Sequence, residues 1–292
     1  MDVIIIFNGL GNQMSQYAFY LQKKQLNQST YYIPFCHDHN GLELNHIFNI
    51  NFKQGIRERL LYLLFRVLLT NQLGFIGKCI KWFFGLLNFK IVKEDFNYNY
   101  QPELMKPSKG ITFFYGGWHT EKYFSGVSHQ IRKDFEFKIP NDIDNQNLIT
   151  QIQASNSIAI HVRRGDYLNS QNIGLFGGVC TKSYYQTAVD LMELRHKDCH
   201  FFVFSNDIEW TKKNLNIKAV TYVTCNAGIN SWKDMYLMSI CKHQIIANST
   251  FSWWGAWLNK NIEKHIISPT RFLNNDLKTD VYSDDWEKLS NY

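Results

Sequence analysis

The second half of the chain alternates short apolar runs with amphipathic stretches, and this alternation constrains the fold more than any other feature. Apolar runs occur at 157–162, 201–204, 219–223, 244–247 and 265–267, with helical patterns between them. Strands that alternate with helices in this way form a parallel sheet with helices on both faces, because each parallel connection must cross the sheet. We therefore predict a doubly wound α/β domain over residues 151–292.

Three of these runs end in polar loops, at 161–167, 205–207 and 248–252. Parallel sheets bind ligands in the crevice at the carboxyl ends of their strands. The three loops therefore predict one pocket at that edge of the sheet.

The first loop places Arg163 and Arg164 beside His161 and Asp166. Two adjacent guanidiniums suit an anion, because their planar forks match phosphate oxygens bidentately. The alternative is an arginine pair bound to Asp166 and a surface carboxylate, which is common for isolated pairs.

The other two loops complement the arginines. Asp207 can accept the two N–H groups of a guanine edge. Ser249, Thr250 and Phe251 open a helix, where hydroxyls and free backbone N–H groups make an anion site. Taken singly, Asp207 and Ser249 suit ordinary helix N-caps. Taken together, the loops predict a pocket for a nucleotide diphosphate.

The first half opens with an apolar run at 3–7, a turn at 8–13 containing Gly9 and Gly11, and a helical pattern. Strand, glycine-containing turn and helix begin many nucleotide-binding domains, but Met14 replaces the third glycine of the usual fingerprint. With further runs at 31–35 and 111–115, we predict an amino-terminal domain over residues 1–150, with the boundary near 140–155.

Residues 57–90 are unlike the rest of the amino-terminal domain. Leucine and phenylalanine clusters are interrupted there by basic residues, namely Arg57, Arg59, Arg66, Lys78 and Lys81. We predict an inserted helical hairpin whose apolar faces pack on its own domain or on a second subunit. The alternative is a basic amphipathic helix at an anionic bilayer. We favour packing, the more frequent outcome.

Composition narrows the function classes. A chain of 292 residues with 45% hydrophobic residues has enough apolar surface for two folded domains. The net charge of +6 suits an anionic partner, but the basic residues form no dense stripe, which argues against nucleic acid. The six cysteines form no C-x-x-C pair and are expected to be reduced core thiols.

Targeting and metal signals are weak. The apolar run at 3–7 is too short for a signal peptide, and no stretch offers the ~20 apolar residues of a spanning helix. We therefore expect a cytoplasmic protein, with peripheral attachment to the inner face of the membrane as the alternative for 57–90.

Asp142 and Asp144 spell D-x-D in a polar linker, where helix capping is the better interpretation. Trp253 and Trp257 share a helical face and are expected in the core.

Five stretches resemble a known family, the bacterial α-1,2-fucosyltransferases of glycosyltransferase family 11, which also includes the blood-group H-type enzymes. They lie at 9–14, 161–167, 204–210, 234–238 and 248–257, in the order the family has them. Residues 40–110 show no family pattern. The resemblance implies a GT-B fold with two Rossmann-like domains facing a cleft. It also implies inverting transfer of L-fucose from GDP-fucose to the 2-hydroxyl of a terminal galactose, without a metal or other cofactor.

The resemblance also implies roles for particular residues. Arg163 would bind the β-phosphate with Arg164 close by, Asp207 would meet the guanine, Ser249 and Thr250 the diphosphate, and Asn12 and Gln13 would approach from the other domain. The family pattern assigns no catalytic base, and His161 and Asp166 are the candidates. The acceptor is a β-galactoside, free or lipid-linked as in lipopolysaccharide or O-antigen biosynthesis. A non-catalytic nucleotide-sugar-binding or lectin-like protein is the alternative, and the oligomeric state stays open.

Overall fold

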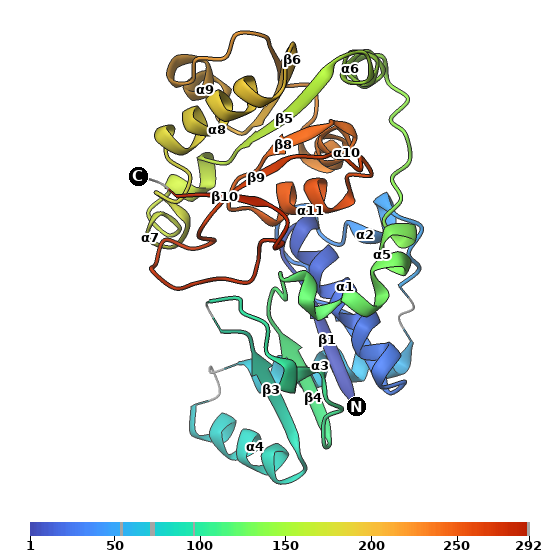
Figure 1. Cartoon of the computed structure of the whole chain (residues 1–292). Coiled ribbons are helices and arrows are strands. Elements are labelled where there is room, and N and C mark those ends of the chain that lie inside the picture. The colour runs from blue at the N-terminus through green and yellow to red at the C-terminus, as the bar shows by residue number, and fades with distance from the viewer. Residues whose placement is uncertain (53–54, 71–73, 96, 291–292) are drawn as a thin grey trace. The chain divides into compact units, whose positions relative to one another are not determined.

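The computed structural model describes residues 1–52, 55–70, 74–95 and 97–290, which form two compact units, Met1–Glu136 and Phe137–Tyr292 (Figure 1). The range 140–155, where the sequence predicted the domain boundary, contains helix α6 (Ile143–Ala154), whereas the two units meet between Glu136 and Phe137. This helix packs on strand β5 (Asn156–Val162) and helix α10 (Trp232–Ile240) of the second unit. The chain therefore divides before α6, because the apolar side chains of α6 belong to the second core.

In its described residues, the first unit holds a four-stranded parallel sheet in the order β2-β1-β4-β3. The strands are β1 (Asp2–Ile6), β2 (Thr30–Pro34), β3 (Phe89–Lys93) and β4 (Ile111–Tyr115). The α-helices are α1 (Leu10–Leu26), α2 (Leu44–Ile47), α3 (Ile56–Leu69), α4 (Gly74–Leu86) and α5 (Ser128–Asp134). Short 3₁₀ turns lie at Pro102–Met105, Glu121–Tyr123 and Ser125–Val127.

Helices cover both faces of this sheet. Phe19 of α1 packs on Phe114, with ring centroids 5.6 Å apart, and Phe65 of α3 packs on Phe113 at 5.5 Å. Phe113 and Phe114 are neighbours in β4, so their side chains point to opposite faces. The first unit is therefore a layered α/β domain, as the sequence predicted.

The second unit has a six-stranded parallel sheet over its described residues, in the order β10-β9-β8-β5-β6-β7. Its other strands are β6 (Cys199–Ser205), β7 (Val220–Val223), β8 (His243–Ile245), β9 (Ile266–Pro269) and β10 (Glu287–Leu289). Its other α-helices are α7 (Ile173–Phe176), α8 (Lys182–Arg195), α9 (Ile208–Asn214) and α11 (Thr250–Leu258). Two 3₁₀ turns lie at Gly165–Leu168 and Gly228–Asn230.

Two apolar cores lie on opposite faces of this sheet. On one face, Ile158 and Ile160 of β5 belong to a cluster with Tyr185 of α8. On the other face, Ala159 belongs to a cluster with Ile152 of α6. Since successive strand residues point to opposite faces, the alternation along β5 fixes which helices cover which side. The predicted doubly wound sheet is confirmed, and the chain has two parallel α/β units, as the GT-B prediction requires.

Each predicted strand appears within a few residues of its expected place, and strands β3 and β10 were not predicted. The predicted hairpin at 57–90 is present as α3 and α4, although residues 71–73 between them lie outside the described residues. Packing is confirmed for the inner face of α3, where Leu61, Phe65 and Leu68 are buried. The outer faces of both helices carry exposed apolar side chains, among them Leu60, Leu63 and Trp82.

Three smaller expectations are also resolved. Asp142 is the N-cap of α6, where its Oδ1 accepts the Asn145 N–H at 3.1 Å, so the capping interpretation is confirmed. Trp253 and Trp257 are buried as expected. All six cysteines lie in the described part of the chain and are unpaired, but Cys79 and Cys225 are exposed, so the core placement is wrong for these two. Within the described residues, no helix is both long and apolar enough to cross a membrane.

Candidate functional site

The three predicted loops leave adjacent strands of the second unit. Strand β5 lies between β8 and β6, and all three run parallel. Their carboxyl ends, at Val162, Ser205 and Ile245, therefore lie at one edge of the sheet. The sequence-predicted loops 161–167, 205–207 and 248–252 lie at the ends of these strands, so the structure brings them together at one edge.

Arg163 is bound to the carboxylate of Asp166, with 2.9 Å between Nη2 and Oδ2. Its guanidinium lies over the Tyr167 ring at 5.6 Å. The Arg163 side chain remains 31% exposed, so its fork is held by a carboxylate and a ring and is still open to a ligand. A guanidinium held in this way needs little rearrangement to meet an anion.

Arg164 is bound to the second loop. Its Nε lies 3.3 Å from Oδ2 of Asp207, and its guanidinium stacks on the Trp210 ring at 3.9 Å. Asp207 also caps α9, because its Oδ1 accepts the Trp210 N–H at 3.2 Å. The ion pairs and the cap that were the ordinary alternatives are thus both present. Asp207 can still accept further hydrogen bonds, because a carboxylate has about four acceptor positions and this side chain is 35% exposed.

Asn206 joins the first two loops. Its side-chain oxygen accepts the backbone N–H groups of Arg164 at 2.9 Å and Gly165 at 3.2 Å, and its amide nitrogen donates to Asp166 at 3.3 Å. A Cβ on Gly165 would come within 2.7 Å of this amide nitrogen. Loop geometry here therefore depends on a glycine facing an asparagine.

The third loop opens α11. Ser249 is its N-cap and accepts the Phe251 N–H at 3.4 Å, while Thr250 and Phe251 are half-buried. The Tyr167 hydroxyl donates to the backbone oxygen of Asn248 at 3.0 Å, which ties the third loop to the first. The amino-terminal N–H groups of α11 form a partial positive charge at this edge, next to the two arginines.

His161 lies on β5 beneath these loops. It is buried, its ring is 5.8 Å from that of Phe251, and its Nδ1 has no hydrogen-bond partner among the described residues. Burial, together with the nearby charge of Arg163, lowers the pKa of His161 to about 3. The imidazole is therefore neutral at pH 7 and a weak proton acceptor.

In the first unit, Asn12 and Gln13 lie in the first turn of α1, directly after the carboxyl end of β1. Gln13 is buried, and its amide donates to the backbone oxygens of Asn8 and Gly41, both at 2.7 Å. Its oxygen accepts the Glu43 N–H at 2.9 Å. Gln13 therefore fixes the loops around it, while Asn12 is half-exposed at the same edge.

Glu94, which the sequence analysis missed, follows β3 at the carboxyl edge of the first unit. Its carboxylate accepts the N–H groups of Gly117 at 2.6 Å and Trp118 at 2.9 Å, and it supports a turn in which Trp118 has φ +54°. Burial raises the pKa of Glu94 to about 7. A signal was present, since the apolar run Ile91-Val92 precedes it, but the flanking lysines masked the strand.

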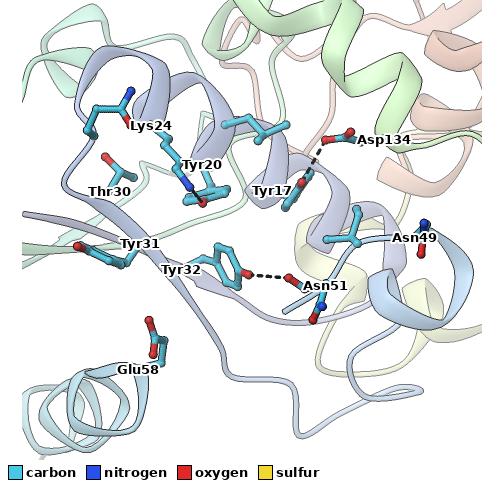
Figure 2. A pocket seen from close by; sticks show the side chains of 13 residues that line it. Tyr17, Tyr20, Lys24, Thr30, Tyr31, Tyr32, Asn49, Asn51, Glu58 and Asp134 are labelled. Carbon is cyan, nitrogen blue, oxygen red and sulfur yellow. Dashed lines mark hydrogen bonds between the residues drawn. The ribbon is translucent and has the colours of Figure 1, made fainter. Parts of the chain in front are cut away.

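Two of the pockets that described residues line lie in the first unit. One, of about 560 Å³, is at the carboxyl end of β2, where His37 and Leu42 face Tyr62 of α3. The other, of about 480 Å³, lies along α1 and the outer strand β2 (Figure 2). In that pocket Tyr17 donates to Asp134 at 3.1 Å and Tyr32 donates to the Asn51 backbone oxygen at 3.3 Å. Asn12 and Gln13 line neither pocket.

Among the described residues, no three His, Cys, Asp or Glu side chains lie together in a way that could hold a metal ion. Asp142, the first residue of the D-x-D sequence, is bound to Lys233 with 2.8 Å between Oδ2 and Nζ. Its carboxylate is thus occupied by a lysine and a helix cap.

The chain thus has two parallel α/β units, and in the second unit two arginines and a helix N-terminus lie at one sheet edge. The chain belongs to glycosyltransferase family 11, whose family model matches residues 88–290. This confirms the family resemblance found in the sequence.

Individual relatives and solved structures are similar to this chain to different degrees. The chain is 34% identical over 283 residues to the alpha-1,2-colitosyltransferase of Escherichia coli, covering 92% of each chain. It is 26% identical over 258 residues to the human galactoside alpha-(1,2)-fucosyltransferase 1, covering 85% of this chain but 62% of the human protein. Among solved structures, an Arabidopsis thaliana FUT1 mutant in complex with GDP matches with a TM-score of 0.49 at 15% identity, covering 91% of this chain and 69% of that one.

Proposed function

We propose that this glycosyltransferase transfers L-fucose from GDP-fucose to the 2-hydroxyl of a terminal β-galactoside, with inversion at the anomeric carbon. The observation that carries the proposal is the convergence of Arg163, Arg164, Asp207 and the start of α11 on adjacent strand ends. The α-1,2 linkage named for the bacterial and the human relatives supports the product.

The chemistry follows from where charge develops. As the bond from the sugar to the β-phosphate breaks, negative charge grows on the phosphate oxygen and positive charge on the sugar. In the proposal, Arg163 and Arg164 meet the diphosphate together with the Ser249 and Thr250 end of α11. Donors that are already in place stabilise this charge more in the transition state than in the ground state. No resident cofactor takes part.

The sugar hydroxyl that attacks the donor must lose its proton, so the reaction needs a general base. Of the two candidates, we propose Asp166 ahead of His161. Asp166 is a carboxylate with 40% of its side chain exposed, whereas the neutral imidazole of His161 is buried and has a pKa of about 3. The matched pair Asp166→Asn and His161→Phe tests this, because loss of the base should lower kcat by ~10²–10⁴-fold in the first variant only.

We place the acceptor at the carboxyl edge of the first unit, in the pocket that Tyr62 lines. An apolar and aromatic lining with a few polar groups suits a sugar ring. Tyr62→Ala should raise the KM for lactose while GDP binding stays unchanged. Tyr32→Ala, in the pocket of Figure 2, is the matched control.

The donor sugar is tested directly. Colitose, the sugar named for the E. coli relative, lacks the 3-hydroxyl of fucose. Supplying GDP-fucose or GDP-colitose with lactose, and reading the product by NMR, gives both the sugar transferred and the anomeric configuration. An α-linked fucosyl product supports the proposal, and a strong preference for colitose would replace fucose as the donor sugar. Binding without turnover of either would leave the nucleotide-sugar-binding alternative.

A further inference from the structure

The outer side of α4 and its exit carry large apolar side chains in contact with solvent. Trp82 is 68% exposed, Phe83 53%, Leu86 62% and Leu87 50%. We refer to these four residues as the α4 patch. Leu86 is four positions from Trp82 and three from Phe83, so it lies on the same side of the helix as both. A contiguous exposed patch of this kind marks an interaction site more often than a single exposed leucine does.

The α4 patch is not the face by which α4 joins its own unit. Phe84, on the opposite side, packs on Phe89 with ring centroids 5.2 Å apart and borders the core that contains Phe65. Figure 1 shows α4 beside β3 at the margin of the first unit. The helix thus has an inner apolar face that is satisfied and an outer one that is exposed.

The charge of the surrounding segment points to the kind of partner. Residues 55–93 contain seven lysines and arginines and one acidic residue, Glu58, which gives a net charge of +6. The whole chain also has a net charge of +6, so all other residues together sum to zero. The excess positive charge of this protein therefore lies entirely in the segment that carries the α4 patch.

Lysines lie on α4 itself and on the segments next to it. Lys78 and Lys81 lie on α4, and Lys90 follows it on β3. Lys109 comes from a different part of the chain, but its neighbour Gly110 lies against Asn88, which directly follows Leu87. Lys78, Lys90 and Lys109 are exposed. The α4 patch is therefore an apolar surface with a basic margin.

We propose that the α4 patch docks the protein on the surface of an anionic lipid bilayer. Tryptophan, phenylalanine and leucine enter the boundary between head groups and acyl chains, and the surrounding lysines bind the acidic head groups. A second copy of this chain fits less well, because it would present the same positive segment to the same surface. The inference concerns a surface remote from the donor loops in sequence and does not depend on the proposed function.

The test is co-sedimentation of the full chain with vesicles of phosphatidylcholine alone or mixed with phosphatidylglycerol. Binding is expected with the mixed vesicles at low salt and is lost at high salt. Trp82→Ser/Phe83→Ser/Leu86→Ser should weaken it about tenfold or more, and Lys78→Glu/Lys81→Glu to a similar extent. These side chains are outside the apolar cores, so circular dichroism should show unchanged folding.

Matched controls come from exposed residues of the second unit. Leu194→Ser/Ile229→Ser/Ile262→Ser removes side chains that are 80%, 77% and 98% exposed, and Lys138→Glu/Lys278→Glu reverses two exposed charges. Both controls should bind like wild type. The proposal is overturned if wild type ignores the mixed vesicles at low salt, or if the α4 variants bind as well as their controls. A concentration-dependent dimer that the α4 variant abolishes would identify self-association instead.

Discussion

Two regions of this molecule are rich in arginine and lysine, and they are built in opposite ways. At the sheet edge of the second unit, Arg163 and Arg164 are each bound to a carboxylate and each lie over an aromatic ring. In segment 55–93, seven basic residues face a single glutamate and stand beside exposed apolar side chains. Guanidinium groups held in fixed positions suit a small, highly charged ligand. A diffuse excess of positive charge suits an extended anionic surface.

The net charge of the chain does not report on the proposed donor site. The value of +6 is compatible with an anionic substrate, yet the residues outside segment 55–93 sum to zero. The arginines at the sheet edge are neutralised locally by Asp166 and Asp207. A pI of 8.8 therefore reflects the α3 and α4 region, and it would be nearly unchanged if the donor site were absent.

The largest predicted effect is that of Arg163→Ala. Transfer should fall by more than ~100-fold, because a charge-assisted contact to the diphosphate costs ~1.5–3 kcal/mol in the ground state and more in the transition state. Arg163→Lys should also be severely impaired, since the bidentate fork is gone. Lys78→Ala, from the other basic region, is the control. Near-normal GDP affinity by calorimetry in Arg163→Ala would refute the phosphate assignment.

The second largest effect should be a difference in salt dependence between the two regions. Between about 0.01 and 1 M salt the Debye length falls from ~30 to ~3 Å, so the diffuse charge of segment 55–93 is screened. We expect vesicle binding to drop by at least an order of magnitude while the Kd for GDP changes several times less. If vesicle binding and GDP binding depended equally on salt, the two basic regions would not differ in function. Titrations with GDP and with mixed vesicles in the same buffers provide the measurement.

Asp207→Asn is predicted to have a moderate effect. Asparagine caps helices about as well as aspartate, so the start of α9 should hold and Tm should change little. The charge that binds Arg164 and that faces the proposed guanine position is lost. GDP binding should weaken by ~3–10-fold and the preference for GDP over ADP should shrink. A variant with unchanged nucleotide preference would remove Asp207 from the base site.

His161 gives a pH prediction for stability. Its folded pKa of about 3 lies below the unfolded value of ~6.5, so the unfolded chain binds the extra proton between these values. The stability that the neutral buried imidazole allows is present above about pH 6.5 and is lost as the pH falls toward 3. His161→Phe should therefore flatten the acid limb of stability by up to ~1.4 kcal/mol per pH unit. Urea unfolding from pH 4 to 7 measures the slope, and an unchanged slope contradicts the burial argument.

The smallest effects concern metal. If the arginines and α11 supply the positive charge, activity should survive excess EDTA. Asp142→Ala should leave kcat unchanged and lower Tm by about 2–4 °C, because it removes the cap of α6, worth ~1 kcal/mol. Loss of activity with EDTA that Mn²⁺ or Mg²⁺ restores would mean that the protein's own cations are insufficient.

Sequence reasoning succeeded where the signal is local. The fully apolar run of β5 and the polar loop after it predicted both a buried strand and a ligand-binding edge. It missed β3 because that edge strand is only partly buried, and lysines break its apolar pattern. Asn206 could not be recognised either, since it acts on Arg164 and Gly165 about forty residues earlier. The buried amide of Gln13 holds a loop in the same long-range way.

The facing pair Gly165 and Asn206 has a consequence for changing this enzyme by mutation. A Cβ at 165 would lie 2.7 Å from the amide nitrogen of Asn206, so this side chain would have to shift, and a shorter residue at 206 would release the two N–H groups that shape the arginine loop. The effects of substitutions at the two positions are therefore expected to be non-additive, because both change the same contact. Libraries that seek a new donor sugar should hold this pair fixed or vary both codons together, and should keep Thr250, which the proposal places at the diphosphate.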